Sequence, residues 1–156
     1  MIDAKQLRTL IIRPVLEHLG MWSPVAENLV AGTAAQESHL QYLKQFGKGP
    51  AIGLWQMEPA THDDLWKNYL QYHNDIAKKV HDLELPAFAG GASEMAGNLY
   101  YGCAMCRIHY RRIKAPLPDD PEDVWALARY WKTYYNTAAG KGRVEEFFSN
   151  YTKVRV

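Results

Sequence analysis

The stretches AQESH at residues 35–39 and GPAIGLWQMEP at residues 49–59 carry most of the structural information in this chain. The first follows a run of small and apolar residues, and the second has the glycines and prolines typical of a tight turn. When residues 24–37 are projected on a helix, Glu37 falls on the same side as the apolar residues. Glu37 is therefore predicted to point inward, beside a glycine-rich turn.

The expected surroundings of Glu37 favour its protonated form. The helix is predicted to begin with Ser23 as N-cap and Pro24 at the first position, and to end near Ser38. Partial burial and the negative end of the helix dipole both raise the pKa of a carboxyl group there. Such a group can keep its proton near neutral pH and act as a general acid in glycosidic bond cleavage. A glutamate in a helix is more often solvated or ion-paired, so this hypothesis needs further support.

The order of several short motifs supplies that support, because it resembles the lytic transglycosylases and their goose-type lysozyme relatives in the lysozyme-like superfamily. The motifs span residues 35–144. They are the pair Glu37-Ser38 for the catalytic ES, Gly49 to Gln56 for the GxxGLMQ turn, Pro59 and Thr61 for the P-x-T helix start, Asn98 to Gly102 for the N-I-x-x-G helix, and Tyr135-Asn136 with Gly142-Arg143-Val144 for the A-Y-N-A-G-x-G-R-V element.

Three features depart from the family pattern. Trp55 stands where the family has methionine, Tyr134 occupies a small-residue position, and the loop from Thr137 to Lys141 is about two residues longer than the pattern. These departures concern the shape of the saccharide groove and leave the assignment of the acid unchanged.

The resemblance implies one lysozyme-like catalytic domain over residues 1–156, of mainly α (α+β) class. It implies cleavage of the β-1,4 bond between N-acetylmuramic acid and N-acetylglucosamine in a peptidoglycan strand, with formation of a 1,6-anhydro end. Glu37 would act first as acid and then as base, without cofactor or metal. The substrate-binding residues that it implies are Ser38, Gln56, Asn98, Tyr135 and Asn136.

A second carboxylate would permit a different reaction. Glycoside hydrolysis usually employs two carboxylates, and Glu58 is the first acidic residue after Glu37. An acid just before Pro59 also suits the positive end of the next helix. Three interpretations stay open: a transglycosylase that uses Glu37 alone, a true muramidase that also uses Glu58, and a non-catalytic saccharide-binding or structural virion protein.

Composition and termini suggest partners and location. The 156 residues have a net charge of +1, which gives no reason to expect nucleic-acid binding, and their 12% aromatic content suits a sugar groove. No apolar run is long enough to span a membrane, and the N-terminus has no signal-peptide pattern. We expect a monomer made in the host cytoplasm that acts on the cell wall or periplasm, as a phage endolysin released by a holin or as a virion-carried enzyme.

Apolar periodicity predicts about six helices around one central buried helix, with a small extended or hairpin element near 40–56. The central helix is marked by the stripe from Met95 to Ile113. A first helix should kink or break at Pro14, and another stripe runs from Leu65 to Val80.

Cysteines and arginines of the central helix have simple interpretations. Cys103 and Cys106 lack a second pair of ligands and are predicted to be buried thiols. Arg107, Arg111 and Arg112 fall largely off the apolar stripe and are predicted to form a solvated face.

Overall fold

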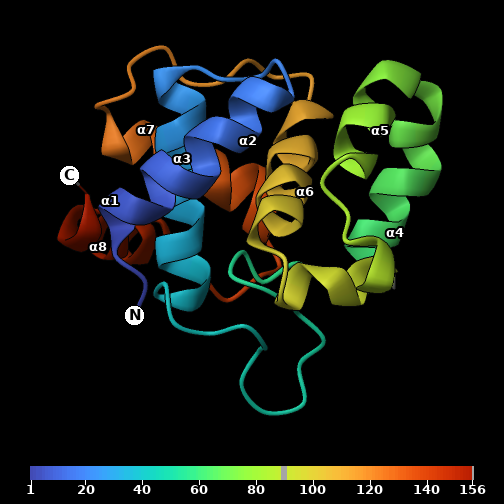
Figure 1. Ribbon diagram of the computed structural model, residues 1–156. Coiled ribbons are helices and arrows are strands. Elements are labelled where there is room, and N and C mark those ends of the chain that lie inside the picture. Colours follow the sequence, from blue (N-terminus) through green and yellow to red (C-terminus); the bar gives the residue numbers. More distant parts are fainter. Residues whose placement is uncertain (89–90, 156) are drawn as a thin grey trace.

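The computed structural model describes residues 1–88 and 91–155 and is mainly helical, which confirms the predicted fold class at that level (Figure 1). The described residues form no β-strand. Two isolated antiparallel bridges, Lys44 with Ile52 and Ile52 with Met57, lie in or next to the segment predicted to be extended. That segment is a long loop that projects from the body of the molecule in Figure 1.

The helical elements follow one another along the whole chain. In order they are α1 Ala4–Gln6, the π-helical η1 Leu7–Ile12, α2 Arg13–His18, α3 Pro24–Ser38, α4 Pro59–Asn68, the 3-10 turn η2 Leu70–Tyr72, α5 Asn74–His81, the 3-10 turns η3 Pro86–Phe88 and η4 Gly91–Ala96, α6 Leu99–Arg111, α7 Val124–Trp131, the π-helical η5 Lys132–Asn136, and α8 Val144–Val154.

Helix α3 begins and ends where the sequence predicts. The Ser23 hydroxyl accepts a hydrogen bond from the backbone N–H of Ala26, and Pro24 opens the helix. His39 stops the helix in the left-handed conformation, with φ of 51°. Residues 29–35 are buried on every side, because small and apolar residues let neighbouring helices approach all faces of α3.

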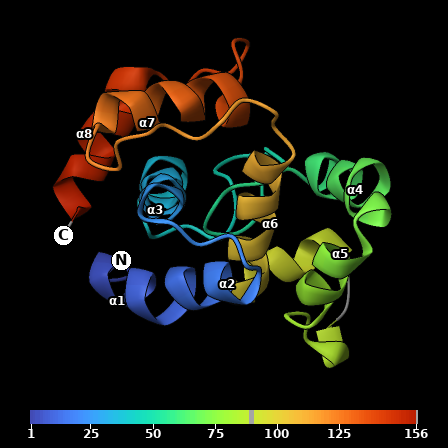
Figure 2. The same cartoon turned by 90° about the horizontal axis from the view of Figure 1, so that it is seen from above.

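Two helices, rather than one, occupy the centre of the fold. Viewed from above, α3 lies between the row formed by α1 and α2 and the pair α7 and α8, with α6 beside it (Figure 2). Residues 101–110 of α6 are all buried, which confirms the predicted central helix. Helices α4 and α5 cover the outer flank of α6 (Figure 2). A single hydrophobic cluster connects these layers.

Two helical predictions need correction. The first helix does not break at Pro14, because the preceding turns are π-helical and Arg13 donates its backbone N–H to the carbonyl of Arg8. The stripe from Leu65 to Val80 is divided between α4 and α5, which are separated by the turn η2.

The side chains of α6 correct a further prediction. Arg107 is 5% exposed, and its Nε donates to the backbone carbonyl of Met21, so it does not belong to a solvated face. Arg111 is exposed, while Arg112 is partly buried and forms an ion pair with Asp64. Cys103 and Cys106 are free and buried, as predicted. Within residues 1–88 and 91–155, no helix has the length and apolarity needed to cross a bilayer.

Candidate active site

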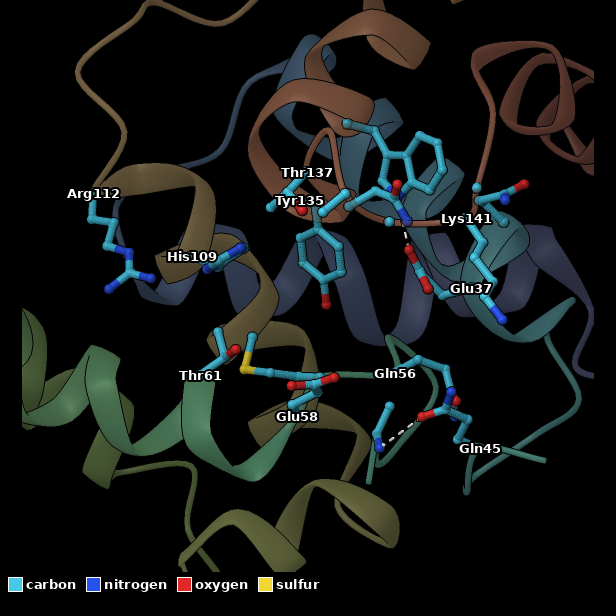
Figure 3. Close-up of a pocket in the computed structure, with 18 residues that line it drawn as sticks. Glu37, Gln45, Gln56, Glu58, Thr61, His109, Arg112, Tyr135, Thr137 and Lys141 are labelled. Atoms are coloured by element: carbon cyan, nitrogen blue, oxygen red, sulfur yellow. Dashed lines mark hydrogen bonds between the residues drawn. The ribbon is translucent and has the colours of Figure 1, made fainter. Parts of the chain in front are cut away.

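A pocket of about 760 Å³ opens where the C-terminal end of α3 meets the loop before α4, the end of α6 and the segment from η5 to α8 (Figure 3). Glu37 and Glu58 are the two carboxylic residues among the described residues that line it. The rest of the lining is mostly polar, with amide, hydroxyl, imidazole and cationic side chains.

Glu37 projects into this pocket from the last turn of α3 and is partly buried. Its Oε1 accepts a hydrogen bond of 2.8 Å from the indole Nε1 of Trp131, the last residue of α7. Burial raises the pKa of Glu37 to about 7, and the hydrogen bond from Trp131 partly opposes this by favouring the ionised form. The carboxyl group can therefore both hold and release a proton near neutral pH.

The glycine-rich turn forms the wall next to Glu37. Gly53 has φ of 82°, and a Cβ there would lie 2.4 Å from the backbone oxygen of Met95, so only glycine fits. Trp55 is buried and donates its Nε1–H to the carbonyl of Val30 on α3, at 3.0 Å. The turn is thereby attached to the helix that carries the carboxyl group.

Gln56 and Tyr135 complete that wall, and both line the pocket. The amide nitrogen of Gln56 donates to the carbonyl of Gly53 at 2.9 Å. The Tyr135 hydroxyl donates to the carbonyl of Trp55 at 2.6 Å rather than to Glu37, and burial raises its pKa well above the ordinary value. Tyr135 therefore supports the turn, and its ring stands between the Glu37 and His109 parts of the pocket in Figure 3.

Two predicted substrate-binding residues lie outside this pocket. Ser38 is fully buried, and its hydroxyl donates to the carbonyl of Ala34 within the helix. Asn98 is the N-cap of α6: its side-chain oxygen accepts from the N–H of Tyr101, and its amide donates to the carbonyl of Leu83. Both side chains are engaged in local structure, so we remove them from the candidate site.

Asn136 and Glu58 do line the pocket, in different roles. The Asn136 side-chain oxygen accepts a 2.6 Å hydrogen bond from the ammonium of Lys132, which also donates to the carbonyl of Gly140. Asn136 therefore helps to hold the loop before α8. Glu58 is exposed at the N-cap position of α4 and makes no side-chain capping bond, so its carboxylate remains available to the pocket.

Sequence reasoning missed several residues at this site. Trp131 is fully buried, and its indole N–H reaches Glu37. His109 lines the pocket beside Tyr135, with ring centroids 4.9 Å apart. Burial, aided by the charge of Arg112, lowers the pKa of His109 to about 4, so its ring is neutral at pH 7. His109 and Arg112 are three residues apart at the end of α6, and this spacing is the sequence signal that could have predicted that their side chains are neighbours.

No cluster of three or more His, Cys, Asp or Glu side chains suited to a metal ion occurs in the described part of the chain. Comparison with protein families, with curated proteins and with solved structures finds no match to this chain.

Proposed function

We propose that this protein is a lytic transglycosylase that cleaves the β-1,4 bond between N-acetylmuramic acid and N-acetylglucosamine in peptidoglycan. The observation that carries this proposal is the Glu37 carboxyl group, whose pKa of about 7 lets it hold a proton in a pocket of about 760 Å³. General acids work best when their pKa lies near the operating pH. The resemblance of the sequence motifs supplies the substrate class.

In the proposed reaction Glu37 gives its proton to the bridging oxygen as the glycosidic bond breaks. The acetamido group of the substrate stabilises the positive charge that develops on the muramic acid residue. The ionised carboxylate then removes the proton of the C6 hydroxyl, and the freed oxygen closes a 1,6-anhydro ring. The proton returns to Glu37, and no water is consumed.

Trp131 supports both halves of this cycle. Its N–H holds the carboxyl group in one orientation, and it stabilises the ionised form that exists between the two proton transfers. Gln56 and Asn136 add amide groups to the pocket wall, which suit the hydroxyl and acetamido groups of neutral sugars.

A muramidase that uses Glu58 is the second candidate. It is favoured by one observation: Glu58 lines the same pocket as Glu37 and is exposed. A second carboxylate on the α4 side of the pocket could align a water molecule for attack on the anomeric carbon. The product would then be a reducing end rather than an anhydro end.

Mass spectrometry of muropeptides released from purified sacculi separates these reactions. We expect anhydro ends from the wild type, a loss of activity of roughly 10²- to 10⁴-fold in Glu37→Gln, and near-normal activity in Glu58→Gln. Reducing ends that disappear in Glu58→Gln would establish the muramidase. A folded wild-type protein that releases nothing would leave a non-catalytic saccharide-binding or virion role.

A further inference from the structure

The cationic side chains near the pocket differ in how they are engaged. Arg112 forms an ion pair with Asp64, and Lys132 donates to Asn136 and Gly140. Lys141 also lines the pocket and is exposed, and its ammonium makes no hydrogen bond or ion pair within the described residues. Lys141 is therefore the cation that remains available to a ligand.

The loop that carries Lys141 is held in place from both sides. Lys132 fastens its start through the carbonyl of Gly140, at 2.9 Å. On the other side, a Cβ at Gly142 would lie 2.6 Å from the ring of Trp131, so only glycine allows this close approach. Since Trp131 is the hydrogen-bond donor to Glu37, the position of Lys141 is tied to that of the acid.

We propose that Lys141 binds a carboxylate on the muramic acid branch of the substrate, and so distinguishes peptidoglycan from uncharged glycans. This inference rests on the proposed function. Figure 3 shows Lys141 and Glu37 on the same side of the pocket, with the lysine side chain extending toward the loop that carries Gln45. In a muramic acid residue bound for cleavage at Glu37, the proposed partner of Lys141 is the lactyl group, with or without an attached peptide, because this branch carries the carboxylate.

Lys141 acts on the substrate rather than on the acid. The pKa of Glu37 is set by burial and by the bond from Trp131, and Lys141 contributes nothing appreciable to it. Substitution of Lys141 should therefore change binding while leaving the pH dependence of cleavage unaltered, which a structural defect in the loop would not do.

Binding of soluble glycan strands tests the proposal, measured in the Glu37→Gln background so that the strands stay intact. Three probes are compared: peptide-free strands with free lactyl carboxylates, the same strands with those carboxylates converted to amides, and strands with intact peptides. Lys141→Met should weaken binding of a carboxylate-bearing strand by about two- to fivefold, the range for an exposed ion pair, and leave the amidated strand unaffected. Lys141→Arg should retain binding, and high salt should remove the difference.

Lys153→Met is the matched control, because Lys153 is an exposed lysine of α8 outside the pocket. A loss confined to peptide-free strands identifies the lactyl carboxylate, and one confined to peptide-bearing strands identifies the peptide carboxylates. Equal losses on charged and amidated strands, or none at all, would overturn the proposal. If the wild type still releases anhydro ends in that case, only the role of Lys141 is lost, whereas a wild type that cleaves nothing refutes the proposed function itself.

Discussion

Replacing Glu37 by glutamine should make the protein more stable at alkaline pH, because the folded protein holds this carboxyl group where ionisation is disfavoured. Below pH 4.5 the group is protonated in both the folded and the unfolded chain, and it carries no penalty. As pH rises through 7, the unfolded chain has already lost the proton while the folded chain is only beginning to do so. The stability that the protonated group provides is then lost.

The size of the effect follows from the pKa. Because the pKa of Glu37 rises from 4.5 to about 7 on folding, the free energy of unfolding is lower by about 3 kcal/mol once the pH exceeds 7. By the same relation, the penalty from Glu37 is only about 1 kcal/mol at pH 5. Glutamine keeps an oxygen that can accept the hydrogen bond from Trp131 and cannot ionise, so Glu37→Gln should escape most of this penalty.

Chemical denaturation of the wild type and of Glu37→Gln at pH 5 and pH 8, together with thermal unfolding at pH 8, measures this difference. The advantage of the variant should grow by about 2 kcal/mol between the two pH values, and its midpoint temperature at pH 8 should be higher by about 5–10 °C. Glu58→Gln is the control for loss of a carboxylate from the same pocket, and its effect should be small because solvent surrounds that side chain. A Glu37→Gln protein that is no more stable than the wild type at pH 8 would refute the reasoning.

Three further substitutions test other parts of the structure. Trp131→Phe removes the N–H that favours the ionised Glu37, so the basic limb of the pH–activity profile should move to higher pH; an unchanged limb would contradict this. Asn98→Ala should lower the free energy of unfolding by about 1–2 kcal/mol through loss of the α6 N-cap and leave KM unchanged, whereas a raised KM would restore Asn98 to the site. His109 is kept neutral, so its own contribution to the free energy of unfolding should fall by about 3 kcal/mol as pH falls from 6.5 to 4; urea titrations at the two pH values should show this as a difference between the wild type and His109→Phe, and the same pH dependence in both proteins would exclude His109 as the cause.

Local signals in the sequence were sufficient for both ends of α3. The start of α3 follows from Ser23 and Pro24, since a hydroxyl cap and a proline at the first position act on neighbouring backbone groups alone. The burial of Arg107 could not be predicted in this way. Its side of α6 is covered by elements distant in the chain, and its Nε meets the carbonyl of Met21, which lies 86 positions away.

The candidate site shows the same division between local and distant information. The motifs pointed to Glu37, Gln56, Tyr135 and Asn136, and the structure places all four around one pocket. Motif matching also selected Asn98, whose side chain satisfies the first turn of α6, as asparagine before a helix commonly does. The contact of Trp131 with the carboxyl group was missed, because the sequence does not reveal where the single N–H of a buried tryptophan points.

Two long-range hydrogen bonds fix the position of the Glu37 carboxyl group on α3 and of the turn beside it. Trp131 reaches Glu37 across 94 positions of sequence, and the Tyr135 hydroxyl reaches the carbonyl of Trp55 across 80. Both donors lie where α7 passes into the π-helical segment η5. The wider π-helical turn changes the direction of successive side chains, so a tryptophan and a tyrosine four residues apart reach different partners around one pocket, and such segments are frequent at functional sites. Packing of α7 against α3 therefore fixes the Glu37 carboxyl group and the turn beside it together, and a substitution that disturbs η5 should impair the proposed cleavage before it unfolds the core.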